Sequence, residues 1–168
     1  FIVPAGLKEI ERYWLQEPYT FASILEDQRM RYYKLIEPAL TKHEKELLER
    51  IYEDLQDIMV LNPTGSRLEK DSLLVDKTLL LLERYRAEIS VPAIHKIIYY
   101  LRRNLLGYDK INPLLYDPYI EDISCDGVKV PIYVYHTRYL NVESNISFGE
   151  EELDSFVIKM CQLNNKHI

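Results

Sequence analysis

The groups best suited to nucleophilic chemistry lie in the segment YDPYIEDISCDGVKVPIYVYH, which runs from Tyr116 to His136. Ser124 and Cys125 offer a hydroxyl and a thiol, and His136 offers an imidazole that could act as their base. Such a site also needs an acid that orients the imidazole, and none can be named from the sequence. A family-specific signature around the cysteine is absent as well. We therefore expect no catalytic residues in this chain.

The same segment is rich in carboxylates, which raises the alternative of a metal site. Glu121, Asp122 and Asp126 would supply oxygen ligands, and His136 a nitrogen ligand. Turns are expected where these acids lie, and the alternation of a strand would place Glu121 and Asp122 on opposite faces. We therefore expect solvated, turn-forming carboxylates and no bound metal.

Nucleotide phosphates are often held by a glycine-rich loop between a strand and a helix, followed by a lysine. The five glycines of this chain are isolated from one another, and no GxxxxGK[ST] motif can be drawn. NPTGSRLEK, at residues 62–70, has a similar composition but the wrong spacing, and it connects two predicted helices. We interpret it as an ordinary loop, so the chain by itself should not bind a nucleotide through a P-loop.

The composition is typical of a folded protein in water. Apolar residues make up 47% of the 168 residues and charged residues 29%, with a formal net charge of -6. That charge provides no general attraction to nucleic acid or to anionic lipid, and no apolar run approaches the roughly twenty residues of a membrane span. Cys125 and Cys161 match neither a zinc site nor a disulfide framework, so we expect a reducing cytoplasm.

The first part of the chain predicts a hairpin. Two extended runs, Tyr19–Leu25 and Arg31–Ile36, flank a polar turn. Pro38 ends the second run, and the hairpin could belong to either lobe of the molecule.

Three amphipathic helices are predicted after the hairpin. Their apolar residues recur at steps of three and four, so the stripes can bury one another in a small helical lobe. A breaker cluster at residues 62–66 separates the first helix from the second. The residues expected to begin or end these helices are Thr41 with Glu44 for the first, Asp71 or Ser72 for the second, and Pro92 and Gly107 for the third.

From Tyr108 onward the hydrophobic period falls towards two, which predicts a small antiparallel sheet. Runs within IEDIS, PIYVYH and VESNISF alternate, and turns are expected at Asp126-Gly127 and at residues 138–141. GEEELDSFVIKMCQL then predicts a helix that packs on this sheet. The residues expected to make that packing are Leu153, Phe156, Val157 and Met160.

These elements predict an α+β fold. Residues 1–107 are expected to form the hairpin and helical lobe, and residues 108–168 the small antiparallel sheet with its packed helix. The chain also has 14 tyrosines, many of them in predicted elements. Because an amphipathic ring suits the rim of a core or an interface, we expect most of them at the rim of the core.

Much of the chain resembles the segment just ahead of the motor core in archaeal secretion ATPases, members of the type II/type IV secretion superfamily. The resemblance is carried by GYDKINPLLYDPYIEDISCDGVKVPIYVYH and NISFGEEEL, which contain DPxIEDIS, DG, PIYVYH and NI-F-EEL in that order, and by a final KHI. RYYKLIEPALTKHE is similar to the family's Y-IEP-L---E segment. The resemblance thus covers most of the chain from about Tyr19.

The resemblance implies a PAS-like N-terminal domain that precedes a RecA-like motor domain. ATP and Mg²⁺ would be bound mainly by the motor domain, which carries the Walker motifs. In the family the N-terminal domain helps to close the nucleotide cleft, packs on the next subunit of a hexameric ring and moves during turnover. The partners implied are the motor domain, neighbouring subunits of a homohexamer and a membrane platform protein, with a cytoplasmic place at the inner face of the membrane and no nucleic acid.

Candidate residues follow from this role. Arg138 and Tyr139, on the turn after the tyrosine-rich strand, are expected on the side of the nucleotide phosphates; the alternative is an ordinary turn arginine. The residues expected to shape turns and contacts with other subunits are Glu121, Asp122, Asp126, Gly127 and His136. Because the chain begins with Phe1, we also expect a piece of a longer protein.

A second hypothesis is a stand-alone PAS-like interaction or sensor module that binds a partner or a small ligand without a motor. The residues that follow Ile168 in the gene distinguish the two hypotheses. A RecA-like stretch with GxxxxGK[ST] would favour the motor, and a stop codon the module. A third hypothesis, a hydrolase that uses Asp122 and His136, is the weakest of the three.

Overall fold

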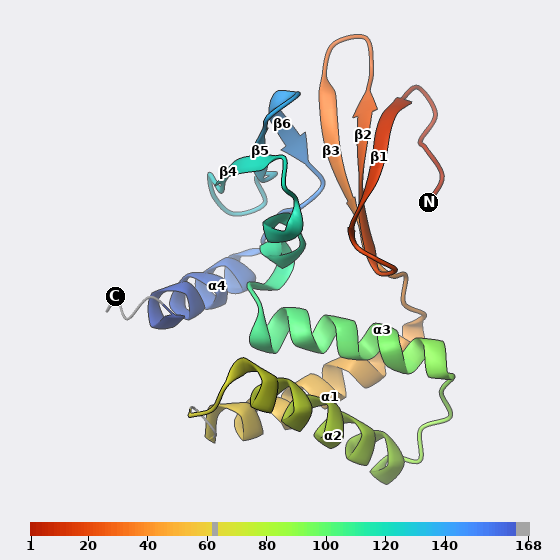
Figure 1. The fold of residues 1–168 in the computed structure, drawn as a ribbon, viewed down its shortest axis with the longest axis vertical. Helices are drawn as coiled ribbons and strands as arrows, with labels where there is room; N and C mark the ends of the chain where they lie inside the picture. Colours follow the sequence, from red (N-terminus) through yellow and green to blue (C-terminus); the bar gives the residue numbers. More distant parts are fainter. Residues whose placement is uncertain (62–63, 164–168) are drawn as a thin grey trace. The chain divides into compact units, whose positions relative to one another are not determined.

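The computed structural model describes residues 1–61 and 64–163, and the chain divides into two compact units (Figure 1). A sheet unit contains Phe1–Glu37 together with the described residues from Lys110 onward, and a helical unit contains Pro38–Asp109. The predicted α+β class is confirmed. The chain passes from the sheet unit to the helical unit after Glu37 and returns to the sheet unit after Asp109. The boundary expected at residue 107 lies close to this return.

The sheet unit is built on six strands in the order β1-β2-β3-β6-β5-β4. The bounds are β1 Lys8–Gln16, β2 Thr20–Glu26, β3 Arg31–Ile36, β4 Ile120–Ser124, β5 Tyr133–His136 and β6 Leu140–Ser144. β3 and β6 run parallel, and the other neighbouring pairs are antiparallel. The predicted hairpin is β2 with β3, and the parallel pair joins it to the strands that follow Lys110 in one mixed sheet.

The sequence analysis did not predict β1. This strand pairs with β2, and Glu11 and Tyr13 lie opposite the buried residues Ile24 and Ala22. The polar partners of Glu11 and Tyr13 are 128 and 104 residues away in the chain. A strand with such polar groups on its core face lacks the hydrophobic alternation that reveals a strand.

One apolar core holds the sheet unit together. Its buried members are Ala22, Ile24, Tyr33, Leu35, Leu114, Ile132, Val134, Val142, Ile146 and Phe148. α4, Glu150–Leu163, packs on it through Leu153 and Phe156, and the Phe156 ring stacks on Phe148 with centroids 4.9 Å apart. The predicted packing of Val157 is wrong. Val157 follows Phe156 on the helix, and its side chain is exposed.

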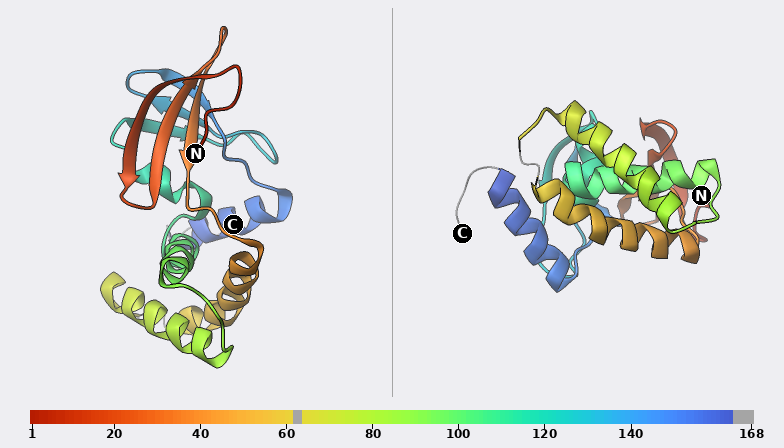
Figure 2. Two further views of the ribbon diagram at one scale, coloured as in Figure 1. Left: turned by 90° about the vertical axis from the view of Figure 1, so that its right-hand side faces the viewer. Right: turned by 90° about the horizontal axis from the view of Figure 1, so that it is seen from below.

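The helical unit contains α1 Lys42–Leu61, α2 Arg67–Arg84 and α3 Val91–Leu101, which pack against one another (Figure 2). As predicted, their apolar stripes bury each other. The buried members of this core are Leu47, Ile51, Leu55, Leu74, Leu82, Ile97, Ile98 and Leu101.

Local capping explains where these helices begin. The capping box of Thr41 and Glu44 is confirmed, because each side chain accepts a bond from the other residue's backbone N–H. α2 begins earlier than predicted, since Ser66 forms a capping box with Glu69. The predicted caps Asp71 and Ser72 therefore lie inside α2, and Pro92 lies in the first turn of α3 as predicted.

The chain leaves α3 through two short helices. These are the π-helix η1, Arg102–Leu106, and the 3-10 helix η2, Asp109–Tyr116. Gly107 ends η1 at the predicted position, in an extended conformation. Asn62 and Pro63 of the breaker cluster, and the final KHI of the family pattern, lie outside the described residues. Among the described residues, no helix combines the length and apolar character that crossing a bilayer requires.

Candidate functional site around His136 and Arg138

His136 is the last residue of β5, and its side chain is completely buried. Aromatic rings enclose it. Tyr119 stacks on the imidazole with centroids 5.5 Å apart, and the ring of Tyr139 lies 4.9 Å away. The rings of Tyr13 from β1 and Tyr33 from β3 lie 6.4 and 6.5 Å from it. Without access to water, this imidazole must find its hydrogen bonds within the protein.

Asp117 is the acceptor at the centre of these rings. The hydroxyls of Tyr13 and Tyr33 each donate to its Oδ2 at 2.7 Å. The backbone N–H of Tyr119 donates to its Oδ1 at 2.8 Å. Asp117 is 5% exposed, so these donors take the place of water around the carboxylate. We call Tyr13, Tyr33, Asp117 and His136 the Tyr–His–Asp network.

The hydrogen bonds of the network assign the tautomer of His136. Tyr13 gives its one proton to Asp117, so its oxygen accepts the bond of 3.0 Å from the Nε2–H of His136. Nδ1 of the same ring accepts a bond of 3.1 Å from the backbone N–H of Arg138. Both ring nitrogens are therefore engaged in the neutral form.

Burial is the main influence on the pKa values of the three rings of the network, those of His136, Tyr13 and Tyr33. It lowers the pKa of His136, although the charges of Asp117 and Glu11 act in the opposite direction. Burial also raises the pKa of Tyr13 and of Tyr33, and Asp117 adds to this effect. The uncharged forms of the three rings are therefore favoured at neutral pH.

Thr137, Arg138 and Tyr139 connect β5 to β6, and we call them the Arg138 turn. The Arg138 guanidinium donates to Glu11 on β1 and lies 4.0 Å from the centroid of the Tyr119 ring. The Tyr139 hydroxyl donates to the second oxygen of Glu11 at 2.7 Å. The bond from Tyr139, and then that from Arg138, hold the pKa of Glu11 below its usual value. The charged carboxylate thus clamps both side chains of the turn.

A cleft of about 400 Å³ opens beside the Arg138 turn. The donor side chains that line it are Gln28, Arg29, Arg31, Tyr139 and Asn141. Arg31 lies 5.5 Å from the centroid of the Tyr139 ring. Guanidinium, hydroxyl and amide groups can all donate to an anion, but Glu26 and Asp27 line the same cleft and balance its charge.

The two residues predicted to face a nucleotide thus have different surroundings. Tyr139 lines the cleft. Arg138 instead forms an ion pair with Glu11, with its side chain 44% exposed. To meet a phosphate, Arg138 would have to exchange the carboxylate oxygen of Glu11 for a phosphate oxygen.

The residues predicted to form subunit contacts also fall into two groups. Glu121 and Asp122 are exposed on β4, an edge strand, where a register shift interrupts the regular alternation expected of them. Asp126 and Gly127 lie in the loop that follows. His136, in contrast, is buried among aromatic rings, and its part in subunit contacts stays a prediction.

The register of the sheet keeps the candidate nucleophiles away from the imidazole. β4 pairs with β5 so that Ile120 lies opposite His136 and Ser124 opposite Tyr133, which separates Ser124 and His136 along the strands. Cys125 is exposed, whereas His136 is buried. Among the described residues, no group of three or more His, Cys, Asp or Glu side chains is placed to hold a metal ion.

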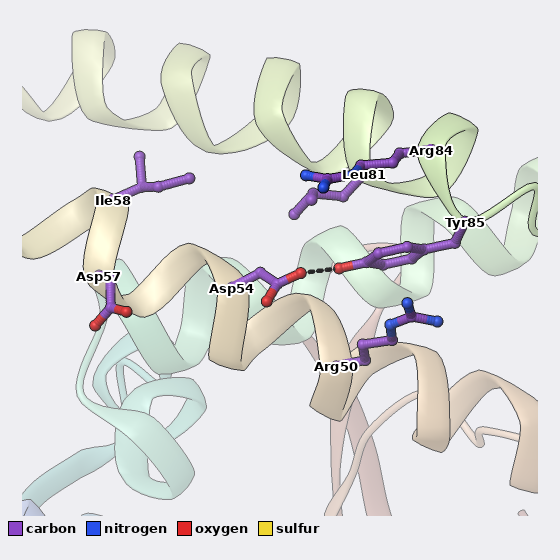
Figure 3. Close-up of a pocket in the computed structure, with 7 residues that line it drawn as sticks. All are labelled: Arg50, Asp54, Asp57, Ile58, Leu81, Arg84 and Tyr85. Atoms are coloured by element: carbon purple, nitrogen blue, oxygen red, sulfur yellow. Dashed lines mark hydrogen bonds between the residues drawn. The ribbon is translucent and has the colours of Figure 1, made fainter.

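A second pocket, of about 460 Å³, lies between α1 and α2 of the helical unit (Figure 3). Tyr85 reaches from the end of α2 towards α1, where its hydroxyl donates to Asp54. The guanidinium of Arg50 lies 3.8 Å from the centroid of the Tyr85 ring. The other lining residues are Asp57, Ile58, Leu81 and Arg84. Its two arginines and two aspartates balance, so the pocket favours neither an anion nor a cation.

Comparison with known proteins gives a family match for the first part of the chain. Residues 1–39 match the family model of the PilB3-like N-terminal region. This stretch contains β1, β2 and β3. A protein of Methanocaldococcus jannaschii, described as the uncharacterized protein MJ1288, is 37% identical over 145 residues, which covers 84% of this chain and 57% of that protein. The chain therefore matches little more than half the length of this relative.

Sequence reasoning missed Glu11, Tyr13, Tyr33 and Asp117 as parts of the site. Glu11 and Tyr13 are two positions apart on one strand, which is the spacing of residues on the same face. A polar pair on a core face indicates a buried network. The spacing of Glu11 and Tyr13 is informative only when residues 8–16 are known to form a strand. The sequence of β1 is too polar to show the hydrophobic alternation that would reveal it.

Proposed function

We propose that this chain is the N-terminal domain of an ATPase of the pilus and secretion superfamily, where it closes over the nucleotide cleft of a motor domain. The observation that supports this best is the PilB3-like match over residues 1–39. β1 and β3, within the matched stretch, supply Glu11, Tyr13 and Tyr33 to the site. The matched part and the Arg138 turn thus belong to one hydrogen-bonded assembly.

In this function the Arg138 turn faces the phosphates of ATP, which the motor domain holds together with Mg²⁺. A guanidinium and a phenol hydroxyl are donors suited to a phosphoryl group that gains charge in the transition state. Glu11 keeps Arg138 and Tyr139 in place when no phosphate is near. Closure of the cleft on ATP and its release after hydrolysis would move the domain and drive protein export or filament assembly.

Ring assembly is the second part of this proposal. β4 is an edge strand, so one side of it has no neighbouring strand among the residues that the structure describes. Its exposed Glu121 and Asp122, with Asp126 and Gly127 in the next loop, are suited to a polar contact with the neighbouring subunit of a homohexamer. A membrane platform protein would hold the ring at the cytoplasmic face of the membrane.

The test is an ATPase assay on the full-length protein that contains this chain and its motor domain. Arg138→Ala should lower the rate about tenfold or more, with little change in folding stability. Arg12→Ala is the matched control, because Arg12 is also on the sheet unit, ion-paired with a glutamate and 42% exposed. Its loss should leave the rate unchanged. An unaltered rate in Arg138→Ala would make Arg138 an ordinary turn residue.

A stand-alone interaction module is the second candidate, and the length of the relative favours it. Because 145 residues are 57% of the Methanocaldococcus jannaschii protein, that protein has about 250 residues. About 110 residues then lie outside the match, which is room for one further domain of modest size but little room for a large motor domain. The length of this relative thus favours a module that works without a motor.

Light scattering on the isolated chain, with and without ATP, separates the two candidates. A domain that depends on its motor should have the same mass in both samples. It should also show no ATP hydrolysis in a separate activity assay. A change of mass on adding ATP would favour the module.

A further inference from the structure

Two hydrogen bonds from the backbone anchor the Arg138 turn to groups outside it. The N–H of Thr137 donates to the carbonyl of Tyr119 at 2.8 Å. The N–H of Arg138 donates to Nδ1 of His136 at 3.1 Å. Only the second acceptor can be protonated. The position of the turn therefore depends on the charge of one buried side chain.

A proton added to His136 would go to Nδ1, because Nε2 already carries the hydrogen that it donates to Tyr13. Nδ1–H would then face the backbone N–H of Arg138, donor against donor. The imidazole is held on its other side by Tyr13 and is enclosed by rings. The turn is the part that must move.

Charges around the imidazole act on this proton in both directions. Glu11 and Asp117 favour the charged form, and burial and Arg138 disfavour it. The titratable and charged groups that face the ring are Glu11 and Tyr13 from β1, Tyr33 from β3, Asp117 and Tyr119 ahead of β4, and Arg138 and Tyr139 from the turn.

We propose that His136 is a positioning residue that holds the Arg138 turn only while its imidazole is neutral, so that mild acid releases Arg138 and Tyr139 from Glu11. Arg138 and Tyr139 contact Glu11, and Arg138 also stacks on Tyr119. All of these contacts depend on the position of the Arg138 turn. Loss of the anchor on His136, one of the two backbone anchors of the turn, therefore loosens them together. The consequence for ATP hydrolysis rests on the proposed function, whereas the release does not.

The test is amide hydrogen exchange measured by NMR on the 168-residue chain, combined with titration of the His136 ring from about pH 8 to about pH 5. The protection factor of the Arg138 amide should fall about tenfold or more as the imidazole takes up its proton. The amide of Ile24, in the core of β2, should keep its protection. An Arg138 protection factor that does not follow the titration overturns the inference. Simultaneous loss at Ile24 also overturns it, because the change would then be global unfolding.

Two variants separate the hydrogen bond from the packing of the ring. H136N offers an amide oxygen near the place of Nδ1 and cannot be protonated in this range, so protection of the Arg138 amide should no longer depend on pH. H136F fills the space without an acceptor and should show low protection at every pH. H95Q, which removes an exposed imidazole on α3, should behave like the wild type. If the His136 variants fail to fold, the wild-type titration still decides.

The full-length ATPase then shows whether the release matters for catalysis. If Arg138 acts on the nucleotide, the wild-type rate should fall below about pH 6.5 and H136N should lose this dependence. Release of the turn with no effect on the rate profile would remove the role of Arg138 at the nucleotide and leave the positioning role of His136 intact. The two proposals can therefore fail separately.

Discussion

The molecule contains a tyrosine–aspartate site in each unit, and the two differ in their surroundings. In the sheet unit, Asp117 is buried and accepts hydrogen bonds from Tyr13 and Tyr33. In the helical unit, Asp54 is exposed and accepts a bond from Tyr85. The same functional groups form an internal network in one unit and a surface contact in the other.

The difference follows from how each unit is assembled. Tyr13 and Tyr33 lie 104 and 84 residues from Asp117 in the chain, whereas Tyr85 lies 31 residues from Asp54. The helical unit is one continuous stretch, and the sheet unit needs two distant ones. Hydrogen bonds in a buried network lose their exchange with water, so breaking one of them costs more free energy than breaking one at the surface.

The largest expected contrast is whether a single stretch can fold. Residues 38–109, prepared alone, should give a helical circular dichroism spectrum and a cooperative thermal transition, because their core and caps lie within the stretch. Residues 1–39 should remain largely unfolded, since β6 and Asp117 are missing. A dispersed NMR spectrum from residues 1–39 would remove the contrast.

Replacing the two aspartates should have very different effects. Asp117→Ala leaves the buried hydroxyl of Tyr33, the half-buried hydroxyl of Tyr13 and one backbone N–H without their acceptor. We expect a loss of about 3 kcal/mol in the free energy of unfolding of the sheet unit. Asp54→Ala, the matched control, should cost about 0.5 kcal/mol or less. Urea denaturation measures both, with Trp14 fluorescence for the sheet unit and circular dichroism for the helices. Equal costs would contradict the importance of burial.

The tyrosine hydroxyls give a smaller version of the same contrast. Tyr33→Phe removes one donor to Asp117 and should cost about 1–2 kcal/mol, because the carboxylate keeps its other bonds but cannot recover water. Tyr85→Phe should cost about 0.5 kcal/mol or less, since water can reach the exposed Asp54. The same denaturation experiments apply, and a larger loss in Tyr85→Phe would show that the surface contact organises the helical unit.

The cap of α2 tests the local basis of the helical unit. Ser66→Ala removes the acceptor for the N–H of Glu69 and should lower the stability of that unit by about 1 kcal/mol. Ser66→Asp, which restores an acceptor, should recover it. Thermal unfolding followed by circular dichroism measures the change, and unaltered stability in Ser66→Ala would mean that packing alone defines the start of α2.

The smallest expected effect has the opposite sign. The hydroxyl of Thr20 is buried and has no hydrogen-bond partner among the described residues. Thr20→Val replaces it with a methyl group of similar shape and should stabilise the sheet unit by about 0.5 kcal/mol. Urea denaturation followed by Trp14 would detect the gain. A loss of stability would indicate a water molecule that satisfies the hydroxyl.

Local patterns predicted those elements that local forces define. The capping box at Thr41, the apolar stripes and the β2–β3 hairpin each depend on residues close together in the chain. The misplaced start of α2 came from reading Ser66 as part of a breaker, although Glu69 three residues later completes a capping box. β1 was missed because its partners are remote.

The turn that carries Arg138 and Tyr139 was predicted, but its interactions were not, and its place at a nucleotide stays a prediction. Arg138 and Tyr139 were recognised as a turn after a tyrosine-rich strand, and the structure brings both to Glu11. The burial of His136 could not be foreseen, because three of the four rings described around it come from β1, β3 and the loop before β4. Alternation along β5 alone does not show what covers each face.

By itself, then, the sequence determined the α+β class, the helices with most of their caps, and the PilB3-like character of residues 1–39. Only the tertiary structure decided that β3 pairs with β6, that His136 is enclosed, and that Glu11 clamps the Arg138 turn. Capping and amphipathic stripes act over a few residues, so they can be read locally. The bonds between side chains of the site join residues 84 to 128 positions apart, and these pairs exist only after the sheet has formed.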